Sequence, residues 1–176
     1  MGAIRSLILA LAGAGVLAAP AAASEDDWPV LKGVRLDGLR PWGAFAVYRA
    51  DRSVTGVSLY FREGQTIARR IETRDGADAV VSWAAARTCP ALIAAVSGLE
   101  KLPAPRIEVP GVGLRPPAAA ASANADSYLL WAEDARFATS AYPVQLEVRG
   151  EGGSPMAAWV DASLRRLASC WSAAQP

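Results

Sequence analysis

Two short segments of this chain alternate apolar and polar side chains with a strict two-residue period, and this pattern narrows the possible folds more than any other feature. In residues 57–62, Val, Leu and Phe alternate with Ser, Tyr and Arg, and in residues 144–149, Val, Leu and Val alternate with Gln, Glu and Arg. Such alternation is typical of β-strands that bury one face. The chain therefore requires a sheet with an apolar layer on at least one side.

The clearest helix start follows the second of these strands. Ser154 supplies an N-cap and Pro155 a first-turn proline, a combination that favours helix initiation. The residues after it place apolar side chains at three- and four-residue intervals, which predicts one buried helical stripe. That stripe consists of Met156, Val160, Leu164, Leu167 and Trp171.

The remaining elements are predicted from weaker patterns. Three further segments are predicted to be strands: 44–48, 106–109 and 128–131. The pattern of residues 66–73 suits a strand or a helix, and a strand is favoured. A turn at Glu133–Asp134 predicts a hairpin between 128–131 and 136–140.

Two helices are expected in the middle of the chain. We predict one helix that opens at Asp75–Gly76 and carries Val80, Val81, Trp83 and Ala84. Pro90 should end or kink it, because proline has no amide hydrogen and clashes with the preceding turn. A second helix, capped by Thr88, should then carry the apolar residues from Leu92 to Leu99.

Strands that group together and are followed by helices indicate an α+β fold. We expect an antiparallel sheet of about five to six strands with helices packed on one face, and one disulfide. Residues 24–176 are predicted to form a single domain of this kind. Its most irregular part is a loop at about 103–126, which is rich in proline and alanine.

The amino-terminal 23 residues have the pattern of a cleaved signal peptide. Arg5 precedes an apolar run over residues 7–19, and small residues at Ala21 and Ala23 precede the predicted cut. A retained membrane anchor is the alternative, but several residues of the run are Ala or Gly and spanning needs roughly 20 strongly apolar residues. After cleavage no other segment is apolar enough to span a membrane. The protein is thus expected in the periplasm or the medium of a bacterium.

The chain has two cysteines, Cys89 and Cys170. An even number in an exported protein favours a disulfide. The alternative is a reactive thiol, which usually has a nearby second cysteine or a basic partner. Here 80 residues separate the two cysteines and the chain has no histidine, so a structural disulfide between them is expected.

Composition excludes several classes of function. The chain has 18 Lys and Arg, 17 Asp and Glu, and no histidine. This balance gives no electrostatic reason to bind nucleic acid, and the missing histidine removes the usual catalytic triads and zinc sites. Gly111 and Gly113 lack the third glycine of a dinucleotide fingerprint. No catalytic residue, cofactor or metal ligand is therefore assigned.

Two surfaces are candidates for docking a partner. Trp28 and Trp42 lie beside prolines in irregular sequence, where an exposed ring could dock a sugar or a peptide; the alternative is that they cover the core. Arg69 and Arg70 belong to the densest basic cluster and could bind an anion through their guanidinium groups. Interleaved acidic residues make a salt-bridged surface the alternative there.

These features predict an exported, non-catalytic binding or interaction module whose partner is an envelope protein or a glycan. One alternative is a histidine-free carboxylate hydrolase that acts on glycans. Another is a secreted inhibitor that presents the loop from Pro103 to Pro117. Candidate carboxylates for the hydrolase are Asp75, Asp78, Glu133, Asp134, Glu147 and Asp161.

Overall fold

The computed structural model describes residues 31, 34–74, 78–104, 125–133 and 144–176. Within them the chain forms six strands and two helices. The elements in chain order are β1 (Gly43–Tyr48), β2 (Val54–Arg62), β3 (Gln65–Thr73), β4 (Val80–Ala85), α1 (Ala91–Leu99), β5 (Ser127–Glu133), β6 (Gln145–Glu151) and α2 (Pro155–Arg166).

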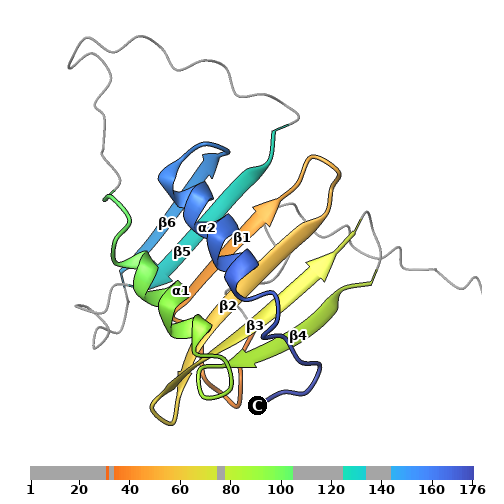
Figure 1. Ribbon diagram of the computed structural model, residues 1–176, viewed down its shortest axis with the longest axis vertical. Coiled ribbons are helices and arrows are strands. Elements are labelled where there is room, and N and C mark those ends of the chain that lie inside the picture. Colours follow the sequence, from red (N-terminus) through yellow and green to blue (C-terminus); the bar gives the residue numbers. More distant parts are fainter. Residues whose placement is uncertain (1–30, 32–33, 75–77, 105–124, 134–143) are drawn as a thin grey trace, which may run out of the picture.

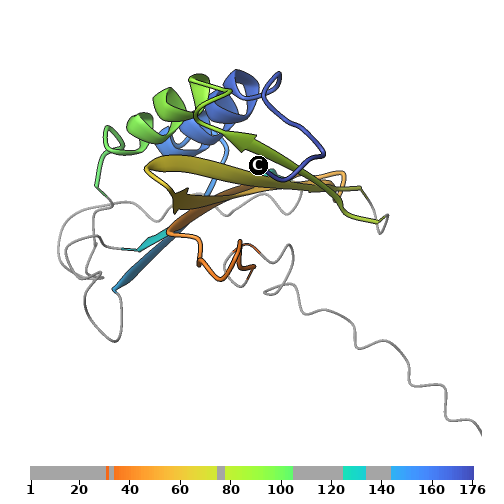
Figure 2. The same ribbon diagram turned by 90° about the horizontal axis from the view of Figure 1, so that it is seen from below.

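All six strands belong to one antiparallel sheet, in the order β4-β3-β2-β1-β5-β6. The first four strands follow each other as neighbours, and β5 returns to the free side of β1, where Phe45 lies opposite Leu130. Both helices cover the same face of this sheet (Figures 1 and 2). The predicted α+β class is therefore confirmed, together with the helices on one face.

The main core lies between the helices and the sheet. Phe45 and Val57 of the sheet pack with Leu92 of α1 and Val160 of α2, and all four are buried. α2 begins as predicted: the Ser154 hydroxyl accepts a hydrogen bond from the Ala157 amide (3.1 Å). The helix and the strand before it thus form where their local sequence signals lie.

The opposite face of the sheet, here called the far face, is covered by Leu31 and residues 34–41, a layer that sequence patterns did not predict. Leu36 is fully buried against Tyr60 of β2. The Ser58 hydroxyl donates to the Leu31 carbonyl (2.8 Å), and the Tyr60 hydroxyl donates to the Val34 carbonyl (3.0 Å). These bonds satisfy polar groups that the covering chain buries.

The helix predicted after Gly76 is wrong, because residues 80–85 form strand β4. Ala84 faces the helices, while Trp83 packs on the far face against Tyr60. With both faces covered, β4 loses the apolar–polar alternation that marks a half-buried strand. Its apolar spacing then resembles that of a helix.

The second predicted helix is confirmed as α1, but it begins differently. Pro90 occupies the N-cap position without a side-chain cap, and the Thr88 hydroxyl instead donates to the Ala85 carbonyl (3.2 Å). Proline is suited to a helix start because the first amide hydrogens have no partner there.

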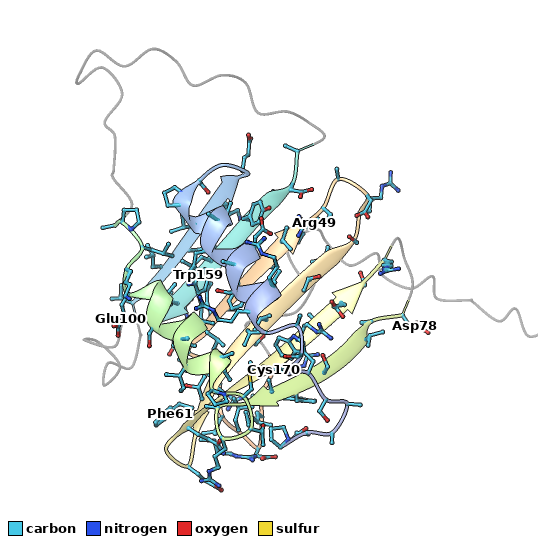
Figure 3. All side chains as sticks on the ribbon, viewed as in Figure 1. Arg49, Phe61, Asp78, Glu100, Trp159 and Cys170 are labelled. Carbon is cyan, nitrogen blue, oxygen red and sulfur yellow. A yellow bond between two sulfur atoms is a disulfide. The ribbon has the colours of Figure 1, made fainter. Side chains whose placement is uncertain are left out.

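The predicted disulfide is present between Cys89 and Cys170, whose Cα atoms are 5.6 Å apart. It joins the turn before α1 to the segment that follows α2, and it lies over the β3–β4 side of the sheet (Figure 3).

Some predictions fall outside the described residues: the signal peptide, the strands at 106–109 and 136–140, and most of the loop at 103–126. None of the helices in the described part of the chain is long and apolar enough to cross a membrane.

Candidate functional site

The helix face carries a cavity of about 400 Å³ near the β6 edge, which we call the apolar pocket. The end of α1, the residues just after it and the start of α2 form its walls, and β5 and β6 form its floor. Aliphatic side chains provide most of its lining: Leu99, Leu102, Pro103, Ala104, Leu130, Ala132, Leu146, Val148, Pro155 and Met156.

The pocket follows from where the two helices end. α1 stops at Leu99 and α2 starts at Pro155, so the neighbouring strands remain uncovered between them. Leu146 is 48% exposed there. Gly150 helps to shape this end, since a Cβ at that position would lie 3.2 Å from the Met156 methyl carbon.

The lining has little polar chemistry. Arg149 is the charged residue of the described lining, but its side chain belongs to the far face of β6, where its Nε donates to Glu147 (3.0 Å). The Ser154 hydroxyl already caps α2. No carboxylate and no aromatic ring belongs to the described lining. The pocket is therefore suited to an aliphatic group and offers no acid or base to one.

A polar cluster surrounds Arg49, which lies beside the middle of α2 (Figure 3). Arg49 contacts Asp126 at 2.6 Å and Asp161 at 3.3 Å. Tyr128 donates its hydroxyl to Asp161 (3.0 Å), and the Ala50 amide donates to Asp126 (3.0 Å). The cluster ties the β1–β2 turn to the start of β5 and to α2, so it is explained by structure.

The contacts in this cluster shift the pKa values of Asp126 and Tyr128 in opposite directions. The hydrogen bond from Arg49 lowers the pKa of Asp126 from its ordinary value of 3.8. Burial, followed by the hydrogen bond to Asp161, raises the pKa of Tyr128. Both groups thus keep their ordinary charge at neutral pH, which gives no sign of a catalytic acid or base.

The two candidate docking arginines point to opposite faces of the sheet, because they are adjacent on β3. Arg70, on the helix face, donates to Ser82 (3.0 Å), pairs with Glu72 (3.2 Å) and lies 4.7 Å from the Trp171 ring centre. Burial lowers the pKa of Arg70. Arg69 lies on the far face, opposite Ser58 and Trp83 in the ladder.

A single anion site cannot use both guanidinium groups. Nη1 of Arg69 is buried and has no partner among the described residues, but its side chain as a whole is partly exposed.

The candidate tryptophans divide in a different way. Trp42 is partly buried and packs against the main core, which supports the interpretation that it covers the core. Trp28 lies outside the described residues.

The candidate carboxylates are spread over the molecule. Asp78 lies just before β4 at one edge of the sheet (Figure 3), whereas Glu147 lies on β6 at the other edge. Asp161 belongs to the Arg49 cluster, and Asp75 and Asp134 lie outside the described residues. Glu133 and Glu147 are the two described candidates that lie on neighbouring strands, at diagonal positions of the β5–β6 ladder. Among the residues that the structure describes, no group of three His, Cys, Asp or Glu could hold a metal ion.

Sequence reasoning did not find the apolar pocket, because its lining comes from four separate segments of the chain, 99–104, 130–132, 146–150 and 154–156. The exposed Val144 and Leu146 were the available signal, and they were interpreted as a buried strand face. Comparison of the chain with protein-family models, curated proteins and solved structures finds no match.

Proposed function

We propose that this protein is an exported, non-catalytic binding module of the bacterial cell envelope, and that its apolar pocket takes an aliphatic chain of the component it binds. The pocket is the observation that carries this proposal. Its volume of about 400 Å³ lies within the range of ligand sites, roughly 300–1,000 Å³. Burial of a hydrocarbon chain in such a pocket is favourable by roughly 25 cal/mol per Å² of apolar surface.

The lining favours an aliphatic chain over a glycan. A sugar carries many hydroxyl groups, and each one buried without a partner costs roughly 1–3 kcal/mol. Ser154 supplies the side-chain hydroxyl of the described lining, and this hydroxyl already caps α2. An acyl chain of an envelope lipid needs no such partners.

Export is supported by two features. Residues 1–23 have the signal-peptide pattern, and the Cys89–Cys170 disulfide belongs to a class of bond that persists in oxidising compartments. Protein recovered from the periplasm or the medium is expected to begin at Ser24, as measured by intact mass. A product that keeps Met1 and remains in the membrane fraction would contradict export.

Titration with a fluorescent fatty acid, such as dansyl-labelled undecanoate, tests the binding site. Mature protein should bind it saturably, and Leu102→Gln should weaken binding roughly tenfold, since it removes a buried aliphatic contact. The control is Ile93→Gln, because Ile93 is 48% exposed on α1 and does not line the pocket. Absence of saturable binding, or equal losses in both variants, would argue against the proposal.

One observation keeps the carboxylate hydrolase as a second candidate. Glu133 and Glu147 lie on the same face of adjacent strands. The Cα atoms of such diagonal neighbours in an antiparallel sheet are about 7–8 Å apart, and the Glu side chains are long enough to place their carboxyl groups at a similar spacing. Inverting glycosidases place their carboxyl groups roughly 6.5–9.5 Å apart. Turnover of a cell-wall glycan that disappears in folded Glu133→Gln or Glu147→Gln would establish this function in place of the binding module.

A further inference from the structure

The sheet has two edge strands, and the described residues cover only one of them. On β4, the Trp83 amide donates to the Ser172 carbonyl (2.7 Å) and the Ser172 amide donates to the Trp83 carbonyl (2.9 Å). The chain after α2 therefore pairs with that edge. β6 lies at the other edge (Figure 1), and no described residue pairs with its outer side.

β6 has no proline, no bulge and no unusually short length, three features that often protect an edge strand, and its charged residues Glu147, Arg149 and Glu151 are the protecting feature that it does carry. All seven of its residues stay in register with β5. The strand contains no proline and exposes Leu146, and Val144 just before it is 51% exposed. A regular edge with apolar side chains is a template for another strand.

We propose that a second copy of the chain pairs with β6 in antiparallel fashion, with Val148 opposite Val148 on a two-fold axis. The two sheets would then form one sheet of twice the width. The inference does not depend on what the apolar pocket binds.

Charge selects both the partner and the register. A two-fold axis perpendicular to the sheet keeps both sets of helices on one side, so residues of the same face must lie opposite each other. Centred on Val148, all seven residues pair, and Glu147 of each copy lies opposite Arg149 of the other. If the two-fold axis passed through residue 147, Glu147 of one copy would lie opposite Glu147 of the other. If it passed through residue 149, the two Arg149 side chains would lie opposite each other. Both arrangements place like charges together, which is unfavourable.

The pairing would also place the two apolar pockets next to each other. Leu146 and Val148 belong to the pocket lining and lie on the helix face of β6, at the centre of the proposed contact. The pairing thus buries edge residues that one copy leaves exposed.

Sedimentation of the mature protein at micromolar concentrations tests the proposal. Twice the mass of one chain is expected, and Glu147→Arg and Arg149→Glu should each raise the dissociation constant roughly tenfold or more, because two attractive pairs become repulsive. An equimolar mixture of these variants should restore the dimer, since each like-charged strand then meets its complement. The double exchange Glu147→Arg/Arg149→Glu should restore it as well.

Disulfide trapping tests the register independently. Val148→Cys should cross-link two copies, because directly opposite Cβ atoms lie about 4.5–5.5 Å apart. Leu146→Cys is the control: it would lie opposite Gly150, roughly 13 Å along the strand from its own copy. A monomer at all concentrations, unchanged association of the single charge variants, or equal trapping of both cysteine variants would overturn the proposal.

Discussion

Arg49 holds three segments of the chain together through two carboxylates. It contacts Asp126 just before β5 and Asp161 on α2, while Asp126 also accepts the Ala50 amide. The side chains of Arg49 and Asp126 remain 40% and 30% exposed. Solvent therefore screens their attraction, and the contribution to stability is modest.

Asp126 should make the protein sensitive to acid. Its pKa is lowered in the folded state, chiefly by the Arg49 hydrogen bond. Its contribution is therefore fully present above its ordinary pKa of 3.8 and is lost as pH falls through the lowered value. Asp126→Asn should lower the free energy of unfolding by about 0.5–1 kcal/mol at pH 7. Below pH 4 this variant should lose less stability than the wild type does. Urea unfolding at several pH values measures both effects.

Asp78→Asn is the matched control, because Asp78 lies exposed beside β4, away from Arg49. Its unfolding free energy at pH 7 should stay within about 0.5 kcal/mol of the wild type. Equal losses in the two variants would contradict the role given to Arg49.

At the scale of elements, the sequence predicted correctly the features that residues close together in the chain determine by themselves. Ser154 and Pro155 fix the start of α2 by satisfying or omitting amide hydrogens, whatever the rest of the fold does. β4 was misassigned because its environment, covered on both faces, comes from tertiary structure. Nor does any period mark Leu31 and residues 34–41 as the cover of the far face, since their contacts depend on Ser58 and Tyr60 of a distant strand.

The contact between the helices depends on the absence of a side chain at Gly98. A Cβ there would lie 2.9 Å from Nε1 of Trp159, whose indole donates to the Ala95 carbonyl (3.1 Å) and whose ring packs edge-on against Phe45. Alanine in place of glycine normally stabilises a helix by about 1 kcal/mol. We expect the opposite for Gly98→Ala: a loss of about 1–2 kcal/mol, because the packed ring must move.

Thermal or urea unfolding measures this effect, and Gly152→Ala is the control. A Cβ at Gly152 meets nothing within 4 Å, so that variant should be close to neutral. A more stable Gly98→Ala protein would show that the Trp159 ring adjusts freely.

At the scale of the whole molecule, the disulfide ties the ends of the helical layer together across a separation of 81 residues. In the chain-entropy model a loop of this length contributes about 4.5 kcal/mol. The variant with both Cys89→Ser and Cys170→Ser should lose up to that amount in denaturant unfolding and still fold, because Leu92 and Val160 keep the core buried. Thiol labelling of the denatured, unreduced wild type should find no free cysteine, and two alkylated thiols would refute the disulfide.

The position of β1 has a consequence for the order of folding. β1 pairs with β2 on one side, close along the chain, but its other partner, β5, is synthesised about eighty residues later. The meander from β1 to β4 can form early because its contacts are local. Until β5 arrives, one edge of β1 stays open and Phe45 and Val47 lack part of their cover. The growing chain thus passes through an interval in which it is open to aggregation.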